Sequence, residues 1–231
     1  MKLMVYNTQH CQNYLTRKID FPLIASIIKD SGADFVGLNE IRGDGPGSEY
    51  TDQTEILSNL SGYEHKFFGD AICVKDQGLY GNAFLSKIPF VSAEKIMVEE
   101  PPLPHAPGYE RRCLIKAKLE NGITVLVIHF GLNRNEREMA VKTVLENIED
   151  EKCVLMGDFN LTPDDELLNP IKEKMVDTAL FFKEPLLSFP SDNPNIKIDY
   201  IFVSKDLEVK TADIPAIIGA DHRPYIVEIN Y

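Results

Sequence analysis

The chain has 231 residues, of which 44% are hydrophobic and 26% are charged, and its formal net charge is -12. This composition is that of a globular protein with an ordinary core, and the length fits one large domain or two small ones. The acidic balance disfavours a broad electropositive surface for nucleic acid, although a bound divalent cation would reverse the field locally. No stretch reaches the roughly 18 apolar residues that a membrane span requires.

The N-terminus and the cysteines indicate the compartment. Residues Met1–Val5 run directly into a strand-like segment without the apolar core of a signal peptide, so we expect a cytoplasmic protein. The four cysteines are widely scattered and show no C-x-x-C spacing. Neither a disulfide framework nor a thiolate zinc site is expected.

Short runs rich in β-branched and aromatic residues recur along the chain and end in turn residues, which predicts strands. In chain order these strands are Lys2–Tyr6, Phe35–Leu38, Tyr80–Leu85, Cys113–Leu119, Ile123–His129, Cys153–Met156, Ile198–Val203 and Tyr225–Ile229. Asn121-Gly122 is typical of a type I′ hairpin, so the two strands that flank it should be antiparallel neighbours.

Three segments between the strands carry apolar residues at helical spacing and follow a capping residue. The predicted helices are Phe21–Ser31, Asp52–Ser61 and a longer one from Asn133 or Asn135 to about Asp150. Three other stretches are predicted to be loops: Arg42–Thr51, Glu99–Glu110 and Lys183–Asn195. Hairpins mixed with crossover helices predict an α/β or α+β sandwich with mixed sheets, and no composition break divides residues 1–231, so we expect one domain.

The most specific motif is Gly157-Asp158-Phe159-Asn160, which ends an apolar strand. Residues two apart on an extended chain point the same way, so Asp158 and Asn160 can face one reacting group. Taken alone, the motif fits a turn equally well, because Asp and Asn commonly end strands.

Other apolar strands also deliver one polar residue at an end. Each instance alone is more readily a structural residue or a solvated surface pair. Together, carboxylates, amides and histidines suit a hard metal and a phosphate. These residues are Asn7, Glu40, His129, Asp199 and the Asp221-His222 pair.

In this order the motifs resemble the endonuclease/exonuclease/phosphatase superfamily, which has the fold of pancreatic-type deoxyribonuclease. The resemblance covers nearly the whole chain and implies a four-layer sandwich of two face-to-face mixed sheets flanked by helices. The site would lie at one end of the sheets. The matching segments are Asn7, Glu40, Tyr80-Gly81-Asn82, Arg111-Arg112, His129, Gly157–Asn160, Asp199-Tyr200 and Asp221-His222.

The resemblance also implies roles. Glu40 is expected to be the principal carboxylate ligand of Mg²⁺ or Mn²⁺, with Asn7 nearby and Asp221 a ligand of the same or a second ion. Asp158 resembles the residue that orients or deprotonates the attacking water, and Asn160 one that donates to a non-bridging phosphate oxygen. Which group takes the proton of the water is left open by the sequence.

His222, oriented by Asp199, resembles the Asp-His pair of the family, and His129 its second phosphate-facing histidine. Arg112 is expected to add charge stabilisation, a role that Arg111 could equally fill. Ala220 stands where many relatives have Ser, so a side-chain hydrogen bond beside the histidine is missing.

Three functions compete. The acidic charge, the short loops and the His129–Leu132 segment, which is similar to that of small bacterial hydrolases, favour a metal-dependent phosphoesterase acting on a small molecule or lipid headgroup. The second hypothesis is a Mg²⁺-dependent nuclease, against which stand the absence of Trp and of a basic stripe. The third is a non-catalytic binding module, which should lack ligands that this chain has. We expect a monomer.

Overall fold

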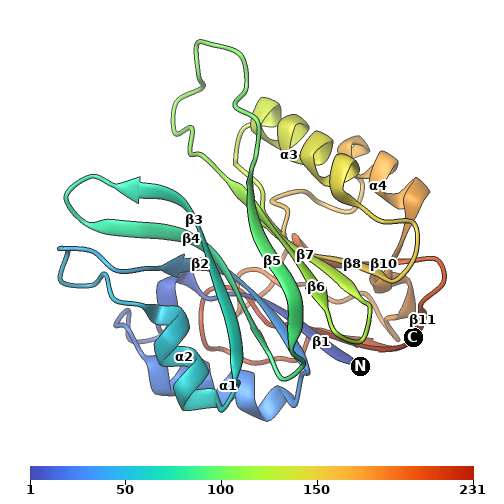
Figure 1. Cartoon of the computed structure of the whole chain (residues 1–231), viewed down its shortest axis with the longest axis horizontal. Helices are drawn as coiled ribbons and strands as arrows, with labels where there is room; N and C mark the ends of the chain where they lie inside the picture. The colour runs from blue at the N-terminus through green and yellow to red at the C-terminus, as the bar shows by residue number, and fades with distance from the viewer.

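Two six-stranded mixed sheets pack face to face in the computed structural model, which describes residues 1–231 (Figure 1). The first sheet has the order β11-β12-β1-β2-β4-β3, and the second has the order β5-β6-β7-β8-β10-β9. The strands of the first sheet are β1 (Lys2–Asn7), β2 (Phe35–Arg42), β3 (His65–Val74), β4 (Gly78–Ser86), β11 (Glu208–Asp213) and β12 (Tyr225–Asn230). Those of the second are β5 (Phe90–Met97), β6 (Cys113–Leu119), β7 (Thr124–His129), β8 (Cys153–Asp158), β9 (Met175–Asp177) and β10 (Asp199–Ser204).

A parallel pair of strands lies at the centre of each sheet. β1 runs parallel to β2, with Asn7 opposite Asn39, and β7 runs parallel to β8, with His129 opposite Asp158. A helix connects the two strands of each pair, as parallel strands require. Both pairs therefore deliver polar residues at the carboxyl ends of their strands.

Four α-helices and three short 3₁₀ turns complete the chain. The helices are α1 (Phe21–Ser31), α2 (Gln53–Ser61), α3 (Arg134–Asn147) and α4 (Asn169–Lys174), and the turns are Gln9–Cys11, Glu166–Leu168 and Thr178–Phe181. Asp20 caps α1 by accepting a hydrogen bond from the backbone nitrogen of Leu23, and Asp52 caps α2 in the same way. Both helices end at a glycine with left-handed φ, Gly32 and Gly62.

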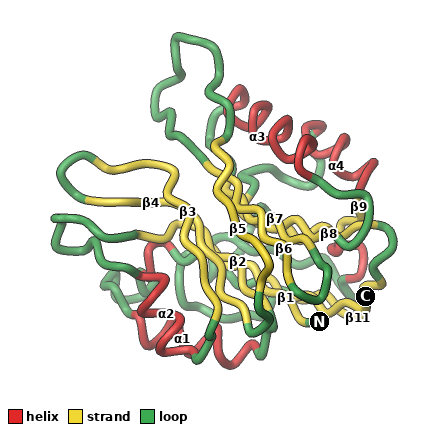
Figure 2. Tube along the Cα trace, viewed as in Figure 1, coloured by secondary structure: helices red, strands yellow, loops and turns green.

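Three apolar clusters lie between four layers, and Figure 2 shows the helices outside the sheets. The central cluster joins the inner faces of both sheets, for example Val5 and Val127. Ile24 and Ile28 of α1 pack on the outer face of the first sheet, and Val144 of α3 packs on that of the second. The four-layer α/β sandwich expected from the sequence is confirmed, and no helix is long and apolar enough to cross a membrane.

The sequence missed four strands and one short helix. All eight predicted strands and three predicted helices are present, with α3 ending at Asn147. The strands that the sequence missed, β3, β5, β9 and β11, are the four edge strands of the two sheets. Edge strands face solvent on more sides, so they lack a continuous apolar run; only one of the six residues of β11 is buried. The short helix α4 was missed as well.

The predicted hairpin between β6 and β7 is antiparallel, but its turn is not type I′. A type I′ turn needs positive φ at both central residues, and here Gly122 has φ 88° while Asn121 is not left-handed. Gly122 N donates to Leu119 O at 3.0 Å, so Leu119–Gly122 form a four-residue turn whose last residue is the left-handed glycine. The arrangement is the three-residue loop with a left-handed last residue that is the next most common hairpin connection.

Candidate active site

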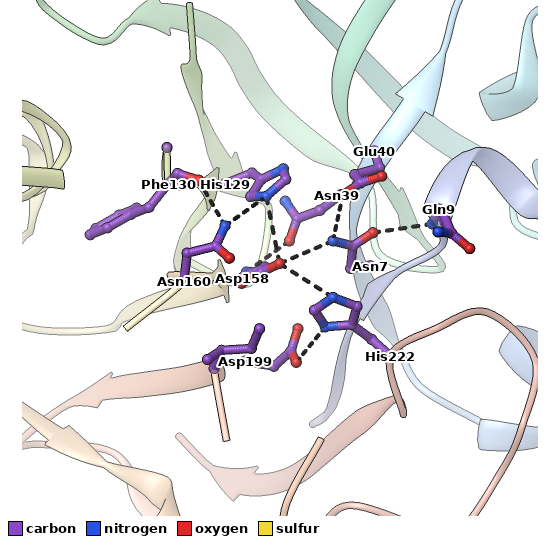
Figure 3. Close-up of polar contacts among 12 residues, drawn as sticks. Asn7, Gln9, Asn39, Glu40, His129, Phe130, Asp158, Asn160, Asp199 and His222 are labelled. Atoms are coloured by element: carbon purple, nitrogen blue, oxygen red, sulfur yellow. Dashed lines mark hydrogen bonds and ion pairs between the residues drawn. The ribbon is translucent and has the colours of Figure 1, made fainter. Parts of the chain in front are cut away.

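The polar residues at the ends of the central strands meet between the two sheets (Figure 3). Asn7 comes from β1, Glu40 from β2, His129 from β7 and Asp158 from β8. Glu40 has the left-handed φ of 59°, and the pairing of β2 with β4 shifts register at this place. The strand therefore continues past Leu38, where the sequence predicted its end, and a bulge turns the carboxylate toward the site.

Asp158 lies at the centre of the cluster and is 2% exposed. Its Oδ1 accepts a hydrogen bond from Asn160 N at 2.9 Å, and its Oδ2 accepts one from Asn7 Nδ2 at 3.0 Å. The Nε2 atoms of His129 and His222 each lie 3.5 Å from the same Oδ2. Burial raises the pKa of Asp158 to about 7, so this carboxyl titrates near neutrality.

His222 lies between two carboxylates. Its Nδ1 donates to Asp199 Oδ2 at 2.8 Å, and its Nε2 faces Asp158. Burial alone would lower the pKa of His222, but Asp199 and Asp158 outweigh that effect and raise it to about 10. His222 is therefore an imidazolium that both acids hold in place.

His129 is the neutral histidine of the site. Burial, with Arg112 and His222 nearby, lowers its pKa well below the usual value. Arg112 Nη1 lies 3.2 Å from His129 Nδ1 and can only donate, so Nδ1 accepts and the ring proton lies on Nε2. That proton faces Asp158 Oδ2. The other end of the guanidinium is paired with Glu110 at 2.7 Å.

The structure separates the two candidate arginines. Arg112 is nearly buried beside His129, whereas Arg111 pairs with Glu100 at 3.0 Å on the surface and is 53% exposed. Asn160 Nδ2 donates to Phe130 O at 3.1 Å, whereas its 3.2 Å contact with the protonated His129 Nε2 joins two donors and is not a hydrogen bond. As placed, the Asn160 amide holds the His129 loop, and its donation to a phosphate oxygen stays a prediction.

Two oxygen atoms without partners belong to residues near Asn7 and Glu40. Asn7 Nδ2 donates to Glu40 Oε1 at 3.0 Å, while Asn7 Oδ1 accepts from Gln9 N at 3.1 Å. Gln9 Oε1 and Asp221 Oδ1 are buried and make no hydrogen bond. Burial, with Glu40 adding to it, raises the pKa of Asp221 to about 6. An acid whose pKa is raised by burial and by a neighbouring carboxylate, beside unpaired oxygens, forms a site suited to a hard cation.

A second group of ligand-type atoms is tighter in space: Asp158, Asp199 and His222 present atoms within 4.8 Å of one another. These atoms already bond to one another, and the imidazolium proton of His222 occupies the nitrogen that a metal would need. We therefore favour Glu40 and Asp221 as the cation side. Asn7 currently offers its nitrogen to Glu40, so its role as a ligand stays a prediction.

Asn39 is a site residue whose role the sequence did not reveal. It is fully buried, and its Oδ1 accepts from Asp158 N at 2.9 Å. Its Nδ2 donates to Asn82 Oδ1 at 2.8 Å and to Ile128 O at 3.1 Å, so one side chain ties the two sheets together at the site. The available signal was a second polar residue directly before Glu40 at the end of an apolar strand.

Comparisons with known proteins agree with this geometry. The model of the Endonuclease/Exonuclease/phosphatase family matches residues 4–222. A solved endonuclease/exonuclease/phosphatase from Beutenbergia cavernae is 22% identical, with a TM-score of 0.79 over 99% of this chain and 71% of that chain. The Bacteroides thetaiotaomicron mannosyl-6-phosphatase is 18% identical, with a TM-score of 0.78 over the full length of both chains. The human nocturnin catalytic domain is 18% identical, with a TM-score of 0.74 over 100% of this chain and 94% of that chain.

No curated protein matches the sequence significantly. At these identities the solved structures show a shared fold, whereas the family match covers nearly the whole length. The order of the motifs and the cluster that they build at the ends of the central strands agree with it. The chain belongs to the Endonuclease/Exonuclease/phosphatase family.

Proposed function

We propose that the protein is a Mg²⁺- or Mn²⁺-dependent phosphoesterase that hydrolyses a phosphodiester of a small molecule or lipid headgroup. The observation that carries the proposal is the setting of Asp158. A buried carboxyl with a pKa raised to about 7 faces one imidazolium and one neutral imidazole across 3.5 Å gaps. These separations are longer than charge-assisted hydrogen bonds, so both N–H groups are available to donate to an oxygen of a bound ligand.

The side chains divide the work of in-line hydrolysis. Asp158 accepts the proton of the attacking water, because a base with a pKa near the working pH is the most effective. The water oxygen bonds to phosphorus as the ester oxygen leaves. The His222 imidazolium and the Nε2–H of His129 donate to phosphoryl oxygens, whose charge grows during the reaction. Asp199 keeps the His222 ring in the orientation and charge state that this donation needs.

The acid side would hold the cation through Glu40 and Asp221, with Asn7 beside them. The unpaired Asp221 Oδ1 and the raised pKa of Asp221 fit a divalent ion bound through oxygen. When bound, such an ion polarises a phosphoryl oxygen and stabilises a leaving oxyanion.

The charges around the site support a small substrate. Arg42 pairs with Glu49 at 2.7 Å, Arg111 with Glu100, and Arg112 with Glu110. Each of these arginines is thus neutralised by a neighbouring acid, and the chain as a whole carries -12. A nuclease must neutralise several backbone phosphates at once. One similar structure bears the name mannosyl-6-phosphatase, which agrees with a small phosphate substrate.

A panel of phosphoesters with and without Mg²⁺ or Mn²⁺ tests the proposal. We expect hydrolysis of bis-para-nitrophenyl phosphate or a headgroup ester, with little nicking of plasmid DNA under the same metal conditions. Asp164→Asn, which changes an exposed acid, is the control for contaminating enzyme, because activity should survive there and vanish in Asp158→Asn. Efficient plasmid nicking with a steep salt dependence would replace this proposal with a nuclease.

A further inference from the structure

The loop between the last 3₁₀ turn and β10 passes behind the Asp199–His222 pair. Ser188 and Ser191 of this loop are both fully buried, although serine is mostly an exposed residue type. The sequence assigned them no role beyond a loop. We refer to Ser188–Ser191 as the serine clamp.

One end of the clamp holds the start of β10. Ser188 Oγ accepts from the backbone nitrogens of Ile198 and Asp199 at 3.3 and 3.4 Å. Ser188 N donates to Ile196 O at 3.0 Å. The backbone from which the Asp199 carboxylate projects is thus fixed from outside the sheet.

The other end holds the segment that carries His222. Ser191 uses all three of its polar groups there: its Oγ donates to Ala220 O at 2.6 Å, its N donates to Asp221 O at 2.7 Å, and its O accepts from Arg223 Nε at 2.7 Å. Arg223 N also donates to Ser188 O at 2.8 Å.

Between the two serines, the Phe189 ring lies 4.8 Å from the His222 ring, centroid to centroid, at 52°. The clamp therefore contacts the histidine ring itself as well as both backbone segments. Ala220 has no polar side-chain group that could anchor this segment. The Ser191 hydroxyl supplies a hydrogen bond to the same residue from a distant part of the chain.

We propose that Ser191, assisted by Ser188, is a positioning residue that sets the Asp199–His222 pair from the loop. This inference rests on the proposed function for its kinetic consequence. Asp199 and His222 come from segments with no direct strand pairing to each other, because β10 and β12 lie in different sheets. Their 2.8 Å hydrogen bond needs a third element to fix the two backbones, and the clamp bonds to both.

Ser191→Ala tests the clamp against a matched control. Ser204→Ala also removes a fully packed hydroxyl from a backbone contact, since Ser204 Oγ accepts from Cys153 N at 2.9 Å at the far end of β10. On bis-para-nitrophenyl phosphate with Mg²⁺, Ser191→Ala should lower kcat roughly 10-fold with little change in KM, because misplacement of a catalytic group slows chemistry more than binding. Ser204→Ala should leave kcat within about twofold.

A second measurement does not depend on turnover. The His222 Nδ1–H proton, bonded to buried Asp199, should give a downfield NMR signal, assigned by its absence from His222→Asn. In Ser191→Ala this proton should exchange faster with solvent, while in Ser204→Ala it should exchange as in the wild type. Ser191→Cys, which nearly keeps the volume and weakens the donor, gives the same comparison if the alanine variant does not fold.

The outcomes separate the two proposals. If the wild type hydrolyses no phosphoester while the signal responds to Ser191 alone, the phosphoesterase assignment fails and the clamp stands. If the wild type is active, yet Ser191→Ala and Ser191→Cys match Ser204→Ala in kcat and in exchange, the clamp has no positioning role.

Discussion

The two sides of the candidate site are built on different principles. On the histidine side, His222, Asp199, Asp158 and His129 contact one another through hydrogen bonds or ion pairs and are nearly inaccessible. On the acid side, Glu40 and Asp221 are only partly buried, and Asp221 has an oxygen without a partner. The histidine side also has one oxygen without a hydrogen-bond partner, Asp199 Oδ1, but the charged groups on this side alternate in sign.

That difference shows which side is complete in the protein alone. The positive charge of the His222 imidazolium is balanced by the two carboxylates beside it, so the histidine side keeps its geometry without a ligand. Two acids of like charge repel each other, and a bound cation or a proton relieves that cost. The histidine side of the site is thus preorganised, whereas the acid side keeps the repulsion between Glu40 and Asp221 where a metal is proposed to bind.

The largest expected effect concerns metal binding at the acid side. Excess EDTA should abolish phosphoester hydrolysis, and Mg²⁺ or Mn²⁺ should restore it, because the acid side cannot assist the leaving oxyanion without a cation. Glu40→Gln should raise the metal concentration needed for half-maximal rate, whereas Glu138→Gln on the exposed face of α3 should not. Full turnover in EDTA would remove the metal from the mechanism.

Asp158→Asn attacks the junction of the two sides. The change keeps the size of the side chain and removes the base, so kcat should fall by roughly 10²-fold or more. Thermal stability should hardly decrease, because a buried carboxyl with a raised pKa is costly to ionise. Near-normal kinetics in a folded variant would reduce Asp158 to a turn residue.

Asp199→Asn tests the histidine side. Losing the carboxylate that holds Nδ1 should lower the pKa of His222 from about 10 toward its ordinary value. Turnover should fall roughly 10-fold at neutral pH and further at alkaline pH, where the neutral ring cannot donate both protons. An NMR titration of the His222 ring measures the shift, and an unmoved titration would contradict the 2.8 Å contact.

The sequence was enough to predict which polar residues end the central strands, but it could not predict the tertiary contacts around them. His129 and Asp158 end apolar strands, and the recurrence of that pattern along the chain, together with the family resemblance, indicated that they lie close together. The bulge at Glu40 and the left-handed φ of Asn160 depend on tertiary pairing, so no local pattern reveals them. The serine clamp is formed by contacts between residues 29 or more positions apart on the His222 side, which residue spacing does not encode.

Lys197 is a further example. Two positions before Asp199, it reads as an ordinary solvated lysine, yet it is 4% exposed. Its Nζ donates to Asp199 O at 3.0 Å and lies 3.3 Å from the centre of the Tyr200 ring. Only the packing of the loop over β10 shows that this cation is buried behind the acids.

The smallest effect concerns stability and follows from the pKa of Asp221. Its folded pKa of about 6 exceeds the ordinary value of 3.8, so the folded state binds the proton more tightly than the unfolded state. The linked stability is fully present below pH 4 and is lost as pH rises through about 6.

In EDTA at pH 7, Asp221→Asn should therefore be more stable than the wild type by about 1–2 kcal/mol, after allowance for the solvent that still reaches this side chain. At pH 3.5 the advantage should vanish, because both states of the wild type are then largely protonated. Saturating Mg²⁺ should reverse the order at pH 7, since the ion stabilises only the protein that keeps its acid. Urea unfolding at both pH values, with and without Mg²⁺, measures all four differences. If the variant gains nothing in EDTA, neither burial nor Glu40 raises the pKa of Asp221, and the acid side carries no electrostatic cost that a cation would relieve.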